Sequence, residues 1–459
     1  MRQLGALLFS CIVLLAIAQD HDEEWGYVGV RPGANMFWWF YRALGNWKDK
    51  PLVMWLQGGP GASSTGFGNF VEIGPLDINL VQRNTTWAQS ANILFVDNPV
   101  GTGFSYVTSK NLLTTSVVEI SLDLLAFLKQ WYQDHQQYHD MPFYIFSESY
   151  GGKMTAAFGS LLITAIKEGR IKCDFKGVAL GDSWISPIGL CVCVCLFLPV
   201  CVLFIVFTSL DSVTSWGPVL YANSLINIKE LKELNSMATD IDHALQSKQF
   251  KYATELWSKM EDYIDDHTDH VDIYNFLVHG NSTVHLSFNQ GYAPTEPVLL
   301  KAIARHVLQD DALSALMNGP IRKKFGSTIP ENVTWGGQSG AVFEAQSVDF
   351  MKDVLSELNY LLLYGVRVVI YSGQLDIICA TQGTLAWVEK LKWNGLPDFL
   401  AAPRTPLYAD TTHKASGYTD GFHQAFHNME FYWILNAGHM VPKDNGKMAL
   451  KMLKMVTGQ

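Results

Sequence analysis

A serine between small residues lies where an apolar run of the sequence ends. The run is Phe143–Phe146, and it is followed by Ser147-Glu-Ser-Tyr-Gly151. In a G-x-S-x-G sequence the serine sits on a sharp turn between a strand and a helix, which exposes its hydroxyl as a nucleophile. Here a serine replaces the first glycine and is still small enough for such a turn. Ser149 is therefore the candidate nucleophile, and the alternative is a chance serine in a Ser/Gly-rich turn.

Two further side chains complete a set that could activate this hydroxyl. Asp376 follows the apolar run Arg367–Tyr371, and His439 follows the run Phe431–Leu435. A histidine can take the serine proton, and a carboxylate can orient and stabilise the resulting imidazolium. A lone Asp or His at a strand end is usually structural. Three such residues in the order Ser149, Asp376, His439 match the triad order of α/β-hydrolases and favour catalysis.

Glycines after another apolar run suit the binding of a developing negative charge. The run Pro51–Leu56 continues into Gln57-Gly-Gly-Pro-Gly61. Because glycine has no side chain, backbone N–H groups there can face a ligand without obstruction, as an oxyanion hole requires. Taken alone, the same residues would also fit an ordinary loop.

Short apolar runs and longer helix-patterned stretches alternate along the chain. The helix-patterned stretches are 121–138, 153–167 and 447–455, and 211–327 is charged and helical in period. Alternation of this kind predicts an α/β fold with a mostly parallel sheet, and the last stretch predicts a helical insertion on it. The runs that read as buried strands are Pro51–Leu56, Asn92–Asp97, Phe143–Phe146, Gly177–Leu180, Arg367–Tyr371 and Phe431–Leu435.

Several longer motifs resemble one family. They are Trp55–Gly61, Phe95–Tyr106, Phe146–Met154, Leu180–Pro187 and Ala437–Pro442. Through them the chain resembles the serine carboxypeptidases, the family that includes yeast carboxypeptidase Y and lysosomal cathepsin A. The resemblance covers nearly the whole chain, apart from its start and one apolar run. It implies an α/β-hydrolase fold with a helical cap, and release of C-terminal amino acids through an acyl-enzyme.

The resemblance also assigns roles to individual residues. Ser149, Asp376 and His439 would form the catalytic triad. The backbone N–H groups of Gly59 and Tyr150 would form the oxyanion hole. The substrate is then the free C-terminus of a peptide or protein.

Three more residues match the part of the family site that holds the C-terminal carboxylate of the substrate. They are Gln57, Glu148 and Glu72. Two close carboxyl groups cannot both ionise cheaply, so one stays protonated at mildly acidic pH and can donate to the substrate. The resemblance thus implies exopeptidase activity favoured at acidic pH. Gln57 stands where the common family motif has Asn, and Ser147 where it has Gly, and both departures bear on substrate preference.

Composition limits the partners. The 459 residues include 33 Lys+Arg and 43 Asp+Glu, with a formal net charge of -10. Nucleic acid is not expected as a partner, since phosphate binding needs clusters of basic residues. Neither a metal nor an organic cofactor is expected. His423 and His427 have the i, i+4 spacing of a zinc pair but lack the glutamate of H-E-x-x-H, so a surface helix is expected there.

The start of the chain resembles a secretory signal. Arg2 precedes the apolar stretch Leu4–Ile17, and Ala16-Ile-Ala18 fits a cleavage site. Residues 1–18 are therefore interpreted as a signal peptide, and a secreted or lysosomal protein is expected. Three N-x-Ser/Thr sequons agree with this route and predict N-glycosylation at Asn84, Asn281 and Asn332.

The stretch 188–210 is uncharged and about as long as a membrane span. A spanning helix would place Ser149 on one side of the bilayer and both Asp376 and His439 on the other. Three interpretations remain: a hydrophobic protrusion or hairpin beside the cap, a segment that prevents productive folding, or a true anchor without catalysis. Membrane association is expected only through this stretch, and a homodimer is left open.

The predicted organisation follows from these segments. It comprises a signal peptide (1–18), the first part of the hydrolase core (19–187), the apolar segment (188–210), the helical cap (211–327) and the second part of the core (328–459). The expected function is that of a serine carboxypeptidase. The alternative is a catalytically impaired carboxypeptidase-like protein that binds or stabilises others because of the apolar segment.

Overall fold

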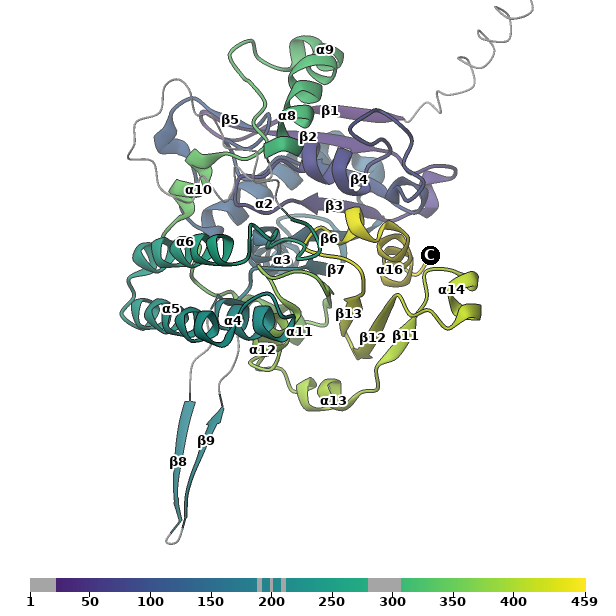
Figure 1. The fold of residues 1–459 in the computed structure, drawn as a ribbon. Helices are drawn as coiled ribbons and strands as arrows, with labels where there is room; N and C mark the ends of the chain where they lie inside the picture. The colour runs from purple at the N-terminus through teal and green to yellow at the C-terminus, as the bar shows by residue number, and fades with distance from the viewer. Residues whose placement is uncertain (1–21, 188–191, 199–200, 208–211, 280–306) are drawn as a thin grey trace, which may run out of the picture.

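The computed structural model describes residues 22–187, 192–198, 201–207, 212–279 and 307–459. Its centre is an 11-stranded sheet in the order β1-β2-β4-β3-β6-β7-β10-β13-β12-β11, with β5 paired to β2 (Figure 1). The inner strands, from β4 to β13, run parallel, and the pairs toward both edges are antiparallel. The α/β-hydrolase fold predicted from the sequence is confirmed.

All six runs that read as buried strands lie in the parallel part of the sheet. The pairs at the edges, such as β1–β2, were not expected from the sequence. The strands of the sheet are β1 (Glu23–Arg31), β2 (Ala34–Tyr41), β3 (Leu52–Leu56), β4 (Asn92–Val96), β5 (Tyr106–Val107), β6 (Pro142–Glu148), β7 (Asp174–Gly181), β10 (Arg367–Gly373), β11 (Thr405–Leu407), β12 (Gly421–Phe426) and β13 (Met429–Ile434).

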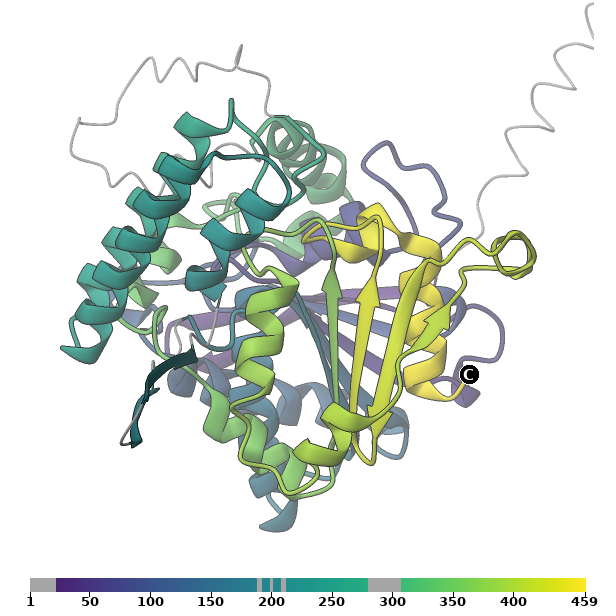
Figure 2. The ribbon, with the colours of Figure 1, turned by 60° about the horizontal axis from the view of Figure 1, so that its bottom comes forward.

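Helices cover both faces of the sheet. The chain between β7 and β10 contributes four longer helices: α4 (Ser212–Ala222), α5 (Ile228–Gln246), α6 (Phe250–His267) and α8 (Val307–Leu316). Figure 2 shows α4, α5 and α6 in teal, gathered beside the sheet as a group of their own. The remaining α-helices of the described chain are α2 (Val117–Asp134), α3 (Tyr150–Lys167), α9 (Arg322–Phe325), α10 (Gly340–Gln346), α11 (Leu355–Leu363), α12 (Thr381–Val388), α13 (Leu396–Ala401), α14 (Thr411–Ser416), α15 (Val441–Asp444) and α16 (Gly446–Thr457), and the π-helix η2 (Ser64–Ile73) carries Glu72.

The core has two halves, one on each face of the sheet. Leu52, Met54 and Leu56 of β3 face one buried cluster, and Val53 and Trp55 face the other. This alternation follows from the two-residue period of a strand. A strand covered by helices on both faces is apolar at every position, which explains why the parallel strands could be recognised as continuous apolar runs.

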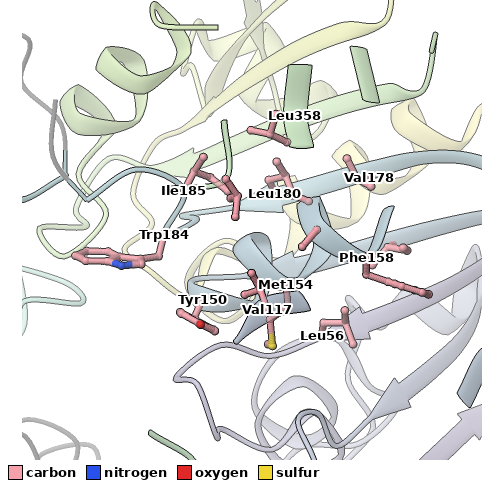
Figure 3. Packing of buried hydrophobic residues seen from close by; sticks show 14 of the residues in the cluster. Leu56, Val117, Tyr150, Met154, Phe158, Val178, Leu180, Trp184, Ile185 and Leu358 are labelled. Atoms are coloured by element: carbon pink, nitrogen blue, oxygen red, sulfur yellow. The ribbon is translucent and has the colours of Figure 1, made fainter. Parts of the chain in front are cut away.

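Helix α3 holds the nucleophile turn against the sheet through its buried face. Figure 3 shows Met154 and Phe158 of α3 beside Val178 and Leu180 of β7, with Leu358 of α11 on the other side. Each of these side chains is essentially excluded from solvent. Burying an apolar side chain of this size contributes about 1.5–3 kcal/mol. The start of α3, where Ser149 lies, is therefore fixed by packing along the whole helix.

The prediction of a surface helix around His423 is wrong. Residues Gly421–Phe426 form β12, which pairs antiparallel with β13, and His427 lies in the turn between them with φ 50°. Pairing with a buried neighbouring strand outweighs local helix propensity here. His423 Nε2 lies 2.9 Å from Glu430 Oε2 on β13, so the histidine pairs across the hairpin and not with His427.

The apolar stretch contains an antiparallel hairpin formed by β8 (Val192–Leu198) and β9 (Cys201–Phe207). The hairpin projects away from the sheet and from helices α4 to α6 (Figure 1). Within the described parts of the chain, no helix combines the length and apolar character needed to cross a bilayer. Of the three interpretations of 188–210, the hairpin is the one whose backbone the structure contains.

One buried lysine ties α3 to the loop before α11. Lys153 is fully buried, and its Nζ donates to the carbonyl oxygens of Asp349, Phe350 (3.2 Å) and Lys352 (2.7 Å). Burial lowers its pKa to about 8. The Nζ also lies 3.7 Å from Asp349 Oδ2, so the ammonium has both hydrogen-bond acceptors and a counter-charge.

We expect Lys153→Met to lower the free energy of unfolding by about 3 kcal/mol, because buried carbonyl groups would lose their donor and a buried carboxylate its partner. Urea unfolding measures the effect. Lys323→Met removes an exposed charge from α9 and serves as the control. Equal stability of the two variants would contradict the role given to Lys153.

Candidate active site

Ser149 lies in a strained turn between β6 and α3, with φ 60° and ψ −130°. Its N–H donates to the carbonyl oxygen of Gly181 and its own carbonyl oxygen accepts from the N–H of Trp184, both at 3.0 Å. A Cβ at Gly151 would lie 2.3 Å from the carbonyl oxygen of Leu56, which explains why a residue without a side chain follows the nucleophile. Backbone strain held by the surrounding structure is typical of functional turns.

The serine at the first glycine position of this motif is accommodated. Ser147 is fully buried, and its hydroxyl donates to the carbonyl oxygen of Ala179 at 3.3 Å. Its own carbonyl oxygen accepts from the Tyr371 hydroxyl at 3.0 Å. The extra hydroxyl therefore has a partner inside the sheet, so the cost of burying a polar group is offset.

Asp376 and His439 meet at the same edge of the sheet. Ser149 follows β6, Asp376 follows β10 and His439 follows β13, and these strands are parallel with β7 between β6 and β10. The Nδ1 atom of His439 lies 2.8 Å from Asp376 Oδ2, and both side chains are almost fully buried. The N–H of Cys379 donates to the other carboxylate oxygen of Asp376 at 3.1 Å.

The structure contains one of the two hydrogen bonds of a triad. The Nε2 atom of His439, which would accept the serine proton, is buried and has no hydrogen-bond partner among the described residues. The Ser149 hydroxyl is therefore not bonded to it in this conformation. Catalytic hydrogen bonds are often long or poorly aligned before substrate binds. Ser149 lies at the end of β6, which β7 separates from β10, and its role as nucleophile stays a prediction.

The glycine-rich loop after β3 lies directly against the Ser149 turn. A Cβ at Gly58 would lie 2.5 Å from Ser149 Cβ and 2.9 Å from the Tyr150 backbone nitrogen. Gly59 has φ 107°, a conformation that side chains disfavour. Gly58, the neighbour of Gly59, and Tyr150 at the start of α3 thus lie beside the serine, and the role of the Gly59 and Tyr150 N–H groups as an oxyanion hole stays a prediction.

Gln57, Glu148 and Glu72 form a buried polar group beside this loop. Gln57 Nε2 donates to Glu148 Oε1 at 2.8 Å, and Trp55 Nε1 donates to Gln57 Oε1 at 2.7 Å. Both oxygens of Glu72 and the second oxygen of Glu148 have no donor in the described part of the chain. Buried acceptors without donors are costly, and each of them is a place where a ligand or a proton can be held.

Burial raises the pKa of both carboxyl groups. The pKa of Glu148 lies well above its usual range because the group is desolvated and because the Glu72 carboxyl is close by. The pKa of Glu72 is raised by desolvation. Two neighbouring buried carboxyl groups with raised pKa values favour a state in which they share one proton.

The side chains of Asp376, Cys379 and His439 offer ligand atoms that lie within 4.8 Å of one another. Both oxygens of Asp376 already accept hydrogen bonds, from the His439 ring and from the Cys379 N–H. We therefore interpret the group as a His–Asp pair with a neighbouring thiol, and not as a metal site. Among the described cysteines, Cys173 and Cys379 are free thiols.

Sequence reasoning missed two neighbours of this pair. The Tyr274 ring packs edge-on against the His439 ring with centroids 4.8 Å apart, and its carbonyl oxygen accepts from the His439 N–H at 2.7 Å. Tyr274 comes from the loop after α6, and no sequence signal marks it. Asp182 lies directly after β7 with its side chain fully buried. The sequence did carry a signal for Asp182, because this residue, like Asp376, is a carboxylate that follows an apolar strand.

Two of the three predicted glycosylation sites lie in the described part of the chain. Asn84 and Asn332 are exposed, as an N-linked glycan requires. Asn281 and the predicted signal peptide lie outside the described residues.

Known proteins match this chain over the whole part that contains the candidate active site. The family model described as serine carboxypeptidase matches residues 16–459. The retinoid-inducible serine carboxypeptidase of Homo sapiens is 48% identical over 446 residues, which cover 96% of this chain and 92% of that protein. Serine carboxypeptidase-like 51 of Arabidopsis thaliana is 40% identical, covering 96% and 93%.

A solved structure agrees with the fold. The crystal structure of a prohormone-processing carboxypeptidase from Saccharomyces cerevisiae superposes with a TM-score of 0.76 at 20% sequence identity, covering 95% of this chain and 91% of that one. The fold, the family match and the two relatives agree with the motifs from which the resemblance was drawn. The chain therefore belongs to the serine carboxypeptidase family and is a serine-type carboxypeptidase.

Proposed function

We propose that this carboxypeptidase works through an acyl-enzyme on Ser149. The Ser149 oxygen attacks the carbonyl carbon of the last peptide bond while His439 Nε2 takes the hydroxyl proton. The C–N bond then breaks, and the leaving amino acid receives that proton from His439. Water repeats the sequence on the ester and regenerates the serine. The buried hydrogen bond between His439 Nδ1 and Asp376 is the observation that carries this proposal.

The two neighbouring backbones would stabilise the intermediate. Each attack turns the carbonyl oxygen into an oxyanion, and the N–H groups of Gly59 and Tyr150 would donate to it. In a site that excludes water, such fixed donors lower the barrier by about 3–4 kcal/mol each. Support for this step is the contact between the Gly58 backbone and the Ser149 turn.

Gln57, Glu148 and Glu72 would select the substrate by its C-terminal carboxylate. The three acceptor oxygens without donors can hold at least one proton, and a protonated carboxyl can donate it to the carboxylate of the substrate. An ionised pair would repel the same group. Because both pKa values are raised, the binding form is present at acidic pH and is lost as the pH rises.

The decisive substrates are a blocked dipeptide with a free C-terminus and its C-terminal amide. For the free acid we expect KM to rise by about 10- to 100-fold between pH 5 and pH 8, since a hydrogen bond to a charged group is lost. KM for the amide should change little. The Glu148→Gln variant should flatten the rise for the free acid, because its amide donates at every pH.

Glu331→Gln removes an exposed carboxylate far from Glu148 in the chain and serves as the matched control. It should keep the pH profile of the wild-type enzyme. An unchanged profile in Glu148→Gln, or equal hydrolysis of acid and amide at pH 5, would contradict the carboxylate clamp.

We further infer a secretory route to a secreted or lysosomal destination. Its support is the apolar stretch Leu4–Ile17 and the exposure of the sequons at Asn84 and Asn332. The apolar hairpin leaves the His439–Asp376 bond in place, so the catalytically impaired alternative gains no support from it. Membrane association through this hairpin stays a prediction.

A further inference from the structure

Asp182 is a second buried carboxyl group at the strand end that bears Asp376. It follows β7, which pairs in parallel with β10, and its N–H donates to the carbonyl oxygen of Tyr371 at 2.9 Å. The residue is fully buried and has φ 38°, a region where glycine is the default. A side chain kept in this conformation, where it costs free energy, indicates that its carboxyl group has a function.

The Asp182 carboxyl interacts with the Gly373 N–H and with the Ser372 side chain, and one of its two oxygens has no hydrogen-bond donor among the described residues. Its Oδ1 atom accepts from the N–H of Gly373 at 2.8 Å, whereas Oδ2 is buried and has no donor among the described residues. Asp376, which interacts with Asp182 directly, has a hydrogen-bond donor for each of its two oxygens. These donors are the His439 ring and the Cys379 N–H. Donors favour the ionised form of the carboxyl that they contact.

The surroundings of Asp182 offer no compensating charge. Within the described chain, neither Asp182 nor Asp376 forms an ion pair with a lysine or an arginine. Among the described residues, His439 is the group in contact with Asp376 that can become cationic. The other titratable groups that face Asp182 become negative or stay neutral, and they are Asp376, Cys379, Glu148 and Tyr371.

We propose that Asp182 is a positioning residue that remains protonated in the working enzyme and donates its acid proton to the Asp376 carboxylate. The two aspartates then carry one negative charge between them, and it rests on the one that contacts His439. Burial, with the nearby Asp376 charge, raises the pKa of Asp182 well above its usual range, in agreement with this arrangement.

The inference rests on the proposed acyl-enzyme function and extends it. The Asp182 proton would be the third donor to the Asp376 carboxylate, after the His439 ring and the Cys379 N–H. It would fix this carboxylate in the orientation that holds the His439 ring. Loss of the Asp182 proton at higher pH would place a second negative charge beside Asp376 and disturb that geometry. Asp182 should therefore act on kcat, in contrast to the Glu72–Glu148 pair, which acts on KM.

Two substitutions separate the roles of donor and acid. Asp182→Asn keeps a donor toward Asp376 and an acceptor for the Gly373 N–H but cannot ionise. Its kcat at pH 5 should lie within about threefold of the wild-type value. As the pH is raised, the kcat of this variant should begin to fall at a higher pH than that of the wild type. Asp182→Ala removes the donor, so its kcat should fall at least about tenfold with KM nearly unchanged.

A second measurement does not depend on activity. A carboxyl whose pKa is raised on folding contributes stability that is present below its unfolded value of 3.8 and is lost as the pH rises toward the folded value. Asp182→Asn should therefore gain stability relative to wild type as the pH rises above about 4. Urea unfolding between pH 4 and pH 7 measures this difference.

The inference is overturned if Asp182→Asn loses as much kcat as Asp182→Ala, or if both keep the wild-type pH profile. An unchanged difference in stability between wild type and Asp182→Asn across this pH range would also overturn it. Labelling of Ser149 by a fluorophosphonate probe, followed by peptide mapping, tests the proposed function separately. A failure confined to the Asp182 variants leaves labelling of the wild-type enzyme intact.

Discussion

Ser149→Ala is expected to lower kcat on a blocked dipeptide at pH 5 by about 10⁵- to 10⁶-fold, the loss seen when a triad nucleophile is removed. Alanine removes only the hydroxyl, and the strained turn that holds it is built from backbone hydrogen bonds to Gly181 and Trp184. The fold and substrate binding should therefore survive. KM or a substrate-analogue Kd measured on the variant checks the binding.

A second serine on the same helix provides the control. Ser160 lies on α3, partly exposed and away from the nucleophile turn, and Ser160→Ala should keep wild-type kcat. Adding His439→Ala to Ser149→Ala should cost almost nothing more, because the members of a triad act as a unit. A variant Ser149→Ala that still releases the C-terminal residue at the wild-type rate would remove the proposed mechanism.

Asp376→Asn is expected to lower kcat by about 10⁴-fold. In the wild-type enzyme the carboxylate accepts from His439 Nδ1, which leaves Nε2 free to take the serine proton. An amide NH₂ placed there would donate to Nδ1 and move the ring proton to Nε2, the wrong tautomer for a base. The change is isosteric, so KM and thermal stability should change far less than kcat.

The exposed Asp398 on α13 is the matched control, and Asp398→Asn should leave kcat at the wild-type value. The tautomer argument also predicts the order of two variants: Asp376→Ala has no amide to enforce the wrong tautomer, so it should be at least as active as Asp376→Asn. A kcat within tenfold of wild type for Asp376→Asn would show that the buried His439–Asp376 bond does not serve catalysis.

The strand ends explain why so much of this site was visible in the sequence. Buried parallel strands must be apolar on both faces, so Phe143–Phe146 and Arg367–Tyr371 stand out as continuous runs. A single polar residue after such a run is usually structural, but three of them in the order of a catalytic triad favour catalysis. Ser149, Asp376 and His439 were found by this rule together with their order along the chain.

Other features depended on neighbours far away in the sequence. His423 lies on β12 and not on a helix because β13 offers a ladder of hydrogen bonds, which local spacing does not reveal. The Tyr274 contact with His439 joins residues from the cap and from the end of the sheet. The raised pKa values of Glu72, Glu148 and Asp182 follow from burial, together with nearby carboxyl groups for Glu148 and Asp182, and burial is a property of the assembled core.

The sequence by itself determined the hydrolase body, the family and the candidate nucleophile, because local apolar periodicity and long motifs encode them. Only the tertiary structure decided that Asp376 holds the His439 ring, that Asp182 lies against Asp376, and that 192–207 contains a hairpin. Charges and protons respond to distance and solvent exclusion, and both arise only when separate strands and helices pack together. The proposed mechanism requires His439 to take the Ser149 proton. A structure of the substrate complex in which Nε2 of His439 still fails to reach the Ser149 oxygen would refute it.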